Sequence, residues 1–168
     1  MTKTEWRLYN PIKNALKINF SDSDECYFEN TSPPRRFSDR LKRQLDDDSL
    51  FILNIEKNFP DLTGYVLRKT MAGEIKEVIV VEVKEKKPTL KDIYQTKRYA
   101  EILKASYGLL ISLEKLSVEH RRFLIKRREI TQFLQSKHIL IGQFNKSMKS
   151  IQIDNELYHD SQIPEPFR

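Results

Sequence analysis

One stretch of the sequence decides the fold: Glu77-Val78-Ile79-Val80-Val81-Glu82-Val83-Lys84. A run this apolar is typical of a strand that is buried inside a sheet. Because side chains alternate along a strand, Glu82 and Lys84 point to the same face while Val81 and Val83 pack behind them. The stretch therefore predicts a core strand that ends, where the sheet opens to solvent, in a carboxylate and an ammonium group.

The neighbouring segments predict the rest of the sheet. This strand begins at about Ile75. Before it the sequence predicts two strands, Leu50 to Ile55 and Leu62 to Lys69, and a turn at Ala72-Gly73-Glu74. After it the sequence predicts a helix from Leu90 to Ala105 and a fourth strand from Tyr107 to Leu113. Three successive strands indicate an antiparallel meander. The strand–helix–strand crossover adds a parallel pair, so a mixed sheet is expected.

The two ends of the chain add helices to this sheet. An N-terminal helix begins at Asn10-Pro11 or, with Pro11 kinking it, near Glu5. The polar segment Ser21 to Pro34 is expected to be a loop, and a second helix begins at Ser38 and ends at Asp46-Asp47-Asp48. Residues 114–168 form an extension with one helix and two strands: Ser117 to Gln135, His138 to Phe144 and Ser150 to Ile153. Residues 1–168 thus predict a single α/β domain with a mixed central sheet flanked by helices.

The composition favours a polyanionic partner. The chain of 168 residues carries a net charge of +6, and its isoelectric point is 9.3. Lys and Arg side chains that neutralise phosphates supply much of the affinity for nucleic acids. The basic residues expected to contact phosphates are Arg35, Arg36, Lys97, Arg121 and Arg122. The single cysteine, and the absence of a membrane-length apolar stretch and of a signal peptide, predict a cytoplasmic protein that has no membrane partner.

Two carboxylates are placed to form a metal site. Asp61 opens the strand from Leu62, Glu82 ends the next strand, and the 20 residues between them form a hairpin whose pairing can bring the two together. Asp61, Glu82 and the backbone carbonyl of Val83 are hard oxygen ligands suited to Mg²⁺ or Mn²⁺. Lys84 can steer or deprotonate an attacking water and stabilise negative charge in the transition state. The pattern predicts phosphodiester hydrolysis.

Three segments resemble the PD-(D/E)xK nucleases, which have the restriction-endonuclease-like fold: Pro60-Asp61, Glu82-Val83-Lys84 and Tyr94-Gln95-Thr96-Lys97-Arg98-Tyr99. The resemblance implies an αβββαβ core from about residue 5 to residue 113. It also implies a Mg²⁺-dependent endonuclease acting on DNA, either duplex or branched, and a homodimer is expected because cutting both strands often uses two active sites. Gln95 on the helix after the motif strand joins the catalytic residues. An acidic residue completes the metal site, for which Glu5 and Asp39 are both candidates.

Other interpretations stay open. Glu-x-Lys also occurs at Glu74 and Glu85, and only the copy at Glu82 combines an apolar strand, an upstream Pro-Asp and a Gln-bearing helix. The alternatives to a nuclease are a non-catalytic nucleic-acid-binding module with the same fold, and a structural protein whose carboxylates form ion pairs with lysines. Five aromatic residues are expected in the core, although any that is exposed could stack on bases: Trp6, Tyr9, Phe37, Tyr65 and Tyr107.

Overall fold

The computed structural model describes residues 5–33, 37–134, 137–158 and 162–168. The helices and strands follow in the order α1 (Trp6–Asn19), β1 (Glu25–Asn30), α2 (Asp39–Lys42), α3 (Asp47–Glu56), β2 (Leu62–Thr70), β3 (Gly73–Lys84), α4 (Leu90–Ile102), β4 (Tyr107–Ser112), α5 (Val118–Lys126), η1 (Arg128–Ile130), β5 (Gln132–Phe133), β6 (Lys137–Asn145), β7 (Ser150–Ile153) and η3 (Glu165–Phe167). Among the described residues, none of the helices has the length and apolar character needed to cross a membrane.

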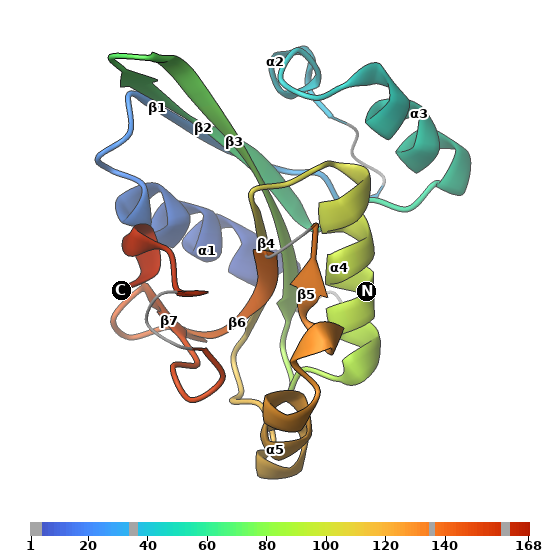
Figure 1. Cartoon of the computed structure of the whole chain (residues 1–168), viewed down its shortest axis with the longest axis vertical. Coiled ribbons are helices and arrows are strands. Elements are labelled where there is room, and N and C mark those ends of the chain that lie inside the picture. The colour runs from blue at the N-terminus through green and yellow to red at the C-terminus, as the bar shows by residue number, and fades with distance from the viewer. Residues whose placement is uncertain (1–4, 34–36, 135–136, 159–161) are drawn as a thin grey trace.

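The described strands form one mixed sheet of seven strands in the order β1-β2-β3-β4-β6-β5, with β7 also pairing with β6. β1, β2 and β3 are antiparallel neighbours, and β3, β4 and β6 run parallel to one another. β5 and β7 are antiparallel to β6. The predicted mixed sheet, with antiparallel strands on one side and a parallel strand–helix–strand crossover on the other, is therefore confirmed, and β3 lies in the middle of the sheet (Figure 1). The predicted meander of three successive strands is not, because α2 and α3 lie between β1 and β2.

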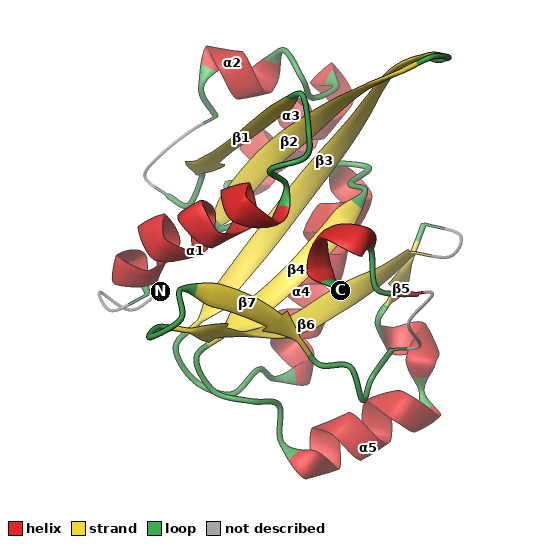
Figure 2. Cartoon of the chain, turned by 90° about the vertical axis from the view of Figure 1, so that its left-hand side faces the viewer, coloured by secondary structure: helices red, strands yellow, loops and turns green. Residues whose placement is uncertain are grey.

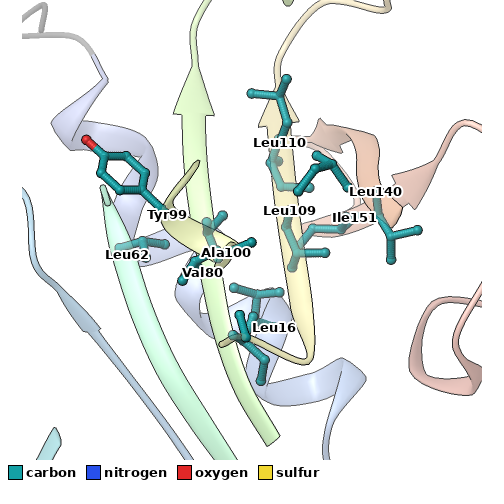
Figure 3. Packing of buried hydrophobic residues seen from close by; sticks show 14 of the residues in the cluster. Leu16, Leu62, Val80, Tyr99, Ala100, Leu109, Leu110, Leu140 and Ile151 are labelled. Carbon is teal, nitrogen blue, oxygen red and sulfur yellow. The ribbon is translucent and has the colours of Figure 1, made fainter. Parts of the chain in front are cut away.

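Helices cover both faces of the sheet. α4 packs on β3 and β4, and Gly108 permits the close approach because a Cβ there would lie 3.2 Å from that of Ala100. α1 and β7 lie on the opposite face, as Figure 2 shows. Figure 3 shows Leu16 of α1 and Ala100 of α4 among strand residues of the buried cluster. β3 is thus an interior strand of a sheet that helices cover on both faces, which is why the run at its centre is so uniformly hydrophobic.

The first strand of the meander was predicted in the wrong place. Leu50 to Ile55 belongs to α3, whereas β1 lies within the segment that was expected to be a loop. The Asp46 side chain caps α3 by accepting from the Ser49 amide at 2.9 Å, so the three aspartates begin this helix and do not end the previous one. β1 is an edge strand in which Phe28 alone is fully buried, and it therefore lacks the apolar alternation that signals a strand.

Two other helix boundaries also differ from prediction. α1 begins at Trp6, the earlier of the two predicted starts, and continues through Pro11. α5 ends at Lys126, where the prediction continued to Gln135, a residue outside the described ranges. The chain leaves the helix because Ile130 and Phe133 are buried through η1 and β5, and β5 pairs with β6. Packing of two apolar residues against the sheet outweighs their helical spacing.

The cap of α3 gives a stability test. Asp46→Ala should lower the free energy of unfolding by about 1 kcal/mol, because it removes the N-cap and leaves the Ser49 amide without its acceptor. Asp48→Ala is the matched control, since Asp48 is exposed in the first turn and contributes only through the helix dipole. Urea denaturation of both variants checks the assignment, and equal losses would contradict a capping role for Asp46.

Candidate active site

The β2–β3 register brings the two predicted carboxylates together. Leu62 pairs with Val81, so Asp61 and Glu82 occupy the next positions of the hairpin. The Asp61 residue is 7% exposed and the Glu82 residue 2% exposed. On the parallel side Glu82 pairs with Leu110 of β4, which makes β3 an interior strand at this point. The carboxylates therefore lie at the buried margin of the sheet, where β2 begins and β3 ends.

Asp61 is held by donors from two elements. The Tyr9 hydroxyl of α1 donates to Oδ1 at 2.5 Å, and the Val83 amide of β3 donates to Oδ2 at 2.8 Å. Burial raises the pKa of Asp61, and the two hydrogen bonds oppose that rise because they favour the ionised form. Tyr9 was expected to be a core aromatic, and it is buried, but its hydroxyl is part of the site. The sequence feature that could have indicated this role is the position of Tyr9 one helical turn after Glu5, a candidate site residue.

Glu82 has one satisfied oxygen and one that is not. Lys84 Nζ and Gln95 Nε2 each donate to Oε2 at 3.3 Å. Oε1 is buried, and the described residues offer it no hydrogen-bond partner. Burial raises the pKa of Glu82 and the charge of Asp61 adds to the rise, while Lys84 opposes both. A buried carboxylate oxygen without a donor is costly in a folded protein, so this atom marks a position that suits a cation.

Lys84 bridges the site and helix α4. Its ammonium group lies 3.3 Å from Glu82 Oε2 and 3.5 Å from Asp92 Oδ1. Burial acts to lower the pKa of Lys84, but the charges of Glu82, Asp61 and Asp92 outweigh it and the pKa is raised. Lys84 is consequently a protonated hydrogen-bond donor at neutral pH.

Helix α4 supplies a polar chain behind Glu82. Thr89 and Asp92 form a capping box that fixes the start of the helix. Gln95 Nε2 also donates to the Tyr99 hydroxyl at 3.5 Å, and that hydroxyl donates to Asn58 Oδ1 at 2.6 Å. Gln95 and Tyr99 are one turn apart on the same face, as the predicted helix required. Asn58 lies in the segment before β2 and belongs to no recognisable sequence motif, so its contact with Tyr99 could not be predicted from the sequence.

The two candidates for a further acidic ligand differ in position. The charge of Glu5 adds to the effect of burial in raising the pKa of Asp61, so Glu5 lies close to the site. The Asp39 carboxylate of α2 has a 91% exposed side chain and pairs with Lys42 at 3.2 Å. Within the described residues, however, no group of three His, Cys, Asp or Glu side chains is arranged to hold a metal ion. The structure thus brings two carboxylates together and leaves Glu5 as an outer neighbour.

The predicted phosphate-binding residues lie in different surroundings. Arg121 is committed to Asp154 at 2.9 Å and Glu156 at 3.0 Å, with a side chain that is 15% exposed. Arg122 is exposed on α5. Hydrogen bonds at the start of this helix lower the pKa of Glu119, and the charges of Lys87 and Arg122 add to that effect. Lys97 Nζ donates to the Glu129 carbonyl at 3.4 Å. Arg35 and Arg36 lie outside the described residues.

Comparisons with known proteins were made for the whole chain. No protein-family model, no curated protein and no solved structure matches it significantly. The function therefore has to be argued from the geometry of Asp61, Glu82, Lys84 and Gln95.

The buried carboxylates predict an unusual pH dependence of stability. An acid whose pKa is raised by folding keeps its proton where the unfolded chain has lost it, so the free energy of unfolding falls as pH rises. Without divalent metal, the protein should lose stability between about pH 5 and pH 9. Glu82→Gln should reduce this slope and stabilise the metal-free protein by about 1 kcal/mol at high pH.

Thermal unfolding across this pH range measures the effect. Glu74→Gln is the matched control, because Glu74 is exposed, lies near the start of the same strand and belongs to another Glu-x-Lys sequence. It should leave the pH slope unchanged. A Glu82→Gln protein that is less stable than wild type at high pH would show that the Glu82 charge is compensated.

Proposed function

We propose that this protein is a metal-dependent nuclease that hydrolyses phosphodiester bonds of DNA. The observation that carries this proposal is that Glu82 Oε1 is buried and has no hydrogen-bond partner among the described residues, while the charge of Asp61, at the neighbouring position of the hairpin, acts on the same carboxyl group. Two buried carboxylates at neighbouring positions repel each other unless a proton or a cation lies between them. Lysines alone do not account for this arrangement, because Lys84 contacts only the other oxygen of Glu82.

The donor set fits Mg²⁺ or Mn²⁺. Asp61, Glu82 and the Val83 carbonyl are hard oxygen ligands on two paired strands, and such cations keep several waters when few protein ligands are present. When bound, the ion would supply Lewis-acid polarisation of a phosphate oxygen and acidify a water molecule. Glu5, whose charge acts on Asp61, would accept hydrogen bonds from waters around that ion.

The chain's own residues have separable roles in this proposal. Lys84, held protonated by its acidic neighbours, orients the attacking water and offsets the charge that develops on the phosphate. Gln95 keeps Glu82 oriented from α4, and Tyr9 keeps Asp61 oriented from α1. Because these two supports come from opposite faces of the sheet, the site geometry depends on the packing of both helices.

The element order also favours a restriction-endonuclease-like core. α1, β1, β2, β3, α4 and β4 follow one another as helix, three antiparallel strands, helix and parallel strand, with α2 and α3 inserted after β1. The catalytic candidates lie at the corresponding ends of β2 and β3. Assembly as a homodimer remains part of the proposal, since two copies are needed to cut both strands of a duplex at one place.

Lys84→Ala separates catalysis from binding. It should reduce the cleavage rate at least about 100-fold, because Lys84 acts in the transition state, while affinity for the same DNA changes little. Cleavage assays with Mg²⁺ or Mn²⁺ are compared with gel-shift affinity measured without metal. Lys76→Ala is the control, since Lys76 is an exposed residue of the same strand that contacts the Gln44 carbonyl.

Two outcomes would contradict this assignment. If cleavage and affinity fall together in Lys84→Ala, Lys84 is a phosphate clamp. If the wild-type protein binds DNA but cleaves no substrate with either metal, the chain is a non-catalytic binding module.

Adjacent arginines on α5 test how DNA is held. Arg122→Ala should reduce the slope of log affinity against log salt by about one, because an exposed arginine is free to neutralise a phosphate. Arg121→Ala should leave the slope unchanged and lower the melting temperature, since Arg121 is paired with Asp154 and Glu156. Salt titrations of both variants provide the comparison. Equal slopes for wild type and Arg122→Ala would show that α5 lies outside the DNA interface.

A further inference from the structure

Asn58 is an exposed residue that side-chain hydrogen bonds connect to the buried carboxylates. It lies in the segment between α3 and β2, shortly before Asp61. Its Oδ1 atom accepts from the Tyr99 hydroxyl at 2.6 Å, and Gln95 Nε2 lies 3.5 Å from that hydroxyl and 3.3 Å from Glu82 Oε2. Burial raises the pKa of Tyr99, and the charges of Glu82 and Asp61 add to the rise. Asn58 is therefore a surface residue beside the candidate metal site.

The Glu82 carboxylate sets the direction of every hydrogen bond in this chain. Its Oε2 atom accepts from the Lys84 ammonium group, so Gln95 has to turn its Nε2 donor toward the same atom. Gln95 Nε2 also donates to the Tyr99 hydroxyl, whose single proton is then left for Asn58. Asn58 consequently turns its carbonyl oxygen inward, and its Nδ2 group, which carries two donor protons, points away from Tyr99.

An open donor remains at the outer end of this chain. Among the described residues, no acceptor lies within hydrogen-bonding distance of Asn58 Nδ2, and the residue is exposed. Both protons of Nδ2 are therefore available to a bound molecule.

The backbone that follows Asn58 is held in place. The Phe59 ring packs edge-to-face on that of Phe37, with ring centroids 5.5 Å apart. The Thr31 hydroxyl donates to the Pro60 carbonyl at 2.8 Å. Because the backbone and the amide of Asn58 are both fixed, little conformational entropy is lost when Nδ2 binds a ligand. A freely rotating surface asparagine would lack this advantage.

A phosphate oxygen of DNA is an acceptor that suits this donor. Hydrogen bonds from side chains such as Asn and Gln to phosphate oxygens fix the register of DNA on a protein without reading its sequence. A neutral amide can lie near a divalent cation without repelling it, which a lysine or an arginine cannot do. Because Gln95 and Tyr99 separate Asn58 from Glu82, Asn58 is expected to meet the next phosphate along the strand and not the attacked one.

We propose that Asn58 Nδ2 donates to an oxygen of the phosphate that neighbours the attacked phosphate on the same DNA strand. This inference rests on the proposed nuclease function and deepens it, since it names a residue that sets the register of the strand at the cleavage point. Asn58 is then a substrate-binding residue, and Tyr99 is a positioning residue that acts through it.

Asn58→Asp changes only the outer half of this side chain. It keeps an oxygen that accepts from Tyr99 and replaces the Nδ2 donor with an oxygen that repels phosphate. Affinity for a labelled DNA duplex, measured by anisotropy with EDTA present, should fall at least about 30-fold in Asn58→Asp and about 10-fold in Asn58→Ala. Asn58→Ala should leave the slope of log affinity against log salt unchanged, because a neutral contact releases no counterion.

Asn14→Asp is the matched control for charge, because Asn14 is an exposed residue of α1 and the substitution makes the same change in net charge. It should bind the duplex like wild type. An equal loss of affinity in Asn14→Asp and Asn58→Asp would overturn the proposal, since net charge alone would explain it. Urea denaturation checks that each variant is folded. If Asn58→Asp is misfolded, Asn58→Ala and a modified DNA decide the matter.

The modified DNA identifies the phosphate that Asn58 contacts. A methylphosphonate linkage replaces one anionic oxygen with a methyl group and can be placed at a single position of a labelled strand. At one of the two linkages that flank a cleaved bond, it should slow cleavage by the wild-type protein with Mg²⁺ about 10-fold. Asn58→Ala should be insensitive to this substitution, and Tyr99→Phe should be less sensitive than wild type. Equal sensitivity of wild type and Asn58→Ala at both flanking linkages would overturn the proposal.

The two proposals fail in different ways. If Asn58→Asp loses affinity but the wild-type protein cleaves no DNA with Mg²⁺ or Mn²⁺, the nuclease function is contradicted and the Asn58 contact stands as part of a binding site. If the wild-type protein cleaves DNA and Asn58→Asp binds and cuts like wild type, the Asn58 contact is contradicted and the nuclease function stands. A wild-type protein that does not bind DNA would contradict both.

Discussion

The antiparallel register between β2 and β3 is the constraint on which the candidate site depends. With Leu62 opposite Val81, the chain has no freedom to keep Asp61 and Glu82 apart. A slip of one residue would turn Glu82 and Lys84 to the face on which Val81 and Val83 pack, at a large cost in burial. The apolar residues of β3 thus maintain an arrangement that is electrostatically unfavourable, since both carboxylates lie in surroundings that raise their pKa values. Functional sites often contain a locally unfavourable arrangement of this kind, which the stability of the surrounding fold maintains.

The polar groups that compensate this cost come from three elements. β3 contributes the Val83 amide and Lys84, α1 contributes the Tyr9 hydroxyl, and α4 contributes Gln95. Since α1 and α4 cover opposite faces of the sheet, each carboxylate is supported from a different side (Figures 1 and 2). Each of these donors contacts one of three carboxylate oxygens, and the fourth oxygen, Glu82 Oε1, has no partner among the described residues.

Sequence patterns were sufficient where an element is long and its surroundings are simple. β2, β3 and α4 have strong periodicity, so the neighbouring positions of Asp61 and Glu82 and the approach of Gln95 could be predicted. Sequence patterns were insufficient for α3, because its apolar run resembles a strand and only the capping role of Asp46 distinguishes a helix from a strand at this position. The edge strand β1 was missed because one fully buried residue is a weak signal. Tyr9 was predicted to be buried, but its hydrogen bond to Asp61 spans 52 positions of the sequence and depends on how α1 crosses the sheet.

The central claim of the proposal is that Asp61 and Glu82 together bind a divalent cation. Anomalous scattering from crystals grown with MnCl₂ tests this most directly, because Mn²⁺ is identified by its own signal. We expect one Mn²⁺ bound by Asp61, Glu82 Oε1 and the Val83 carbonyl, with waters completing the coordination. Crystals that show Mn²⁺ only elsewhere, or Lys84 moved into the space between the two carboxylates, would contradict the account.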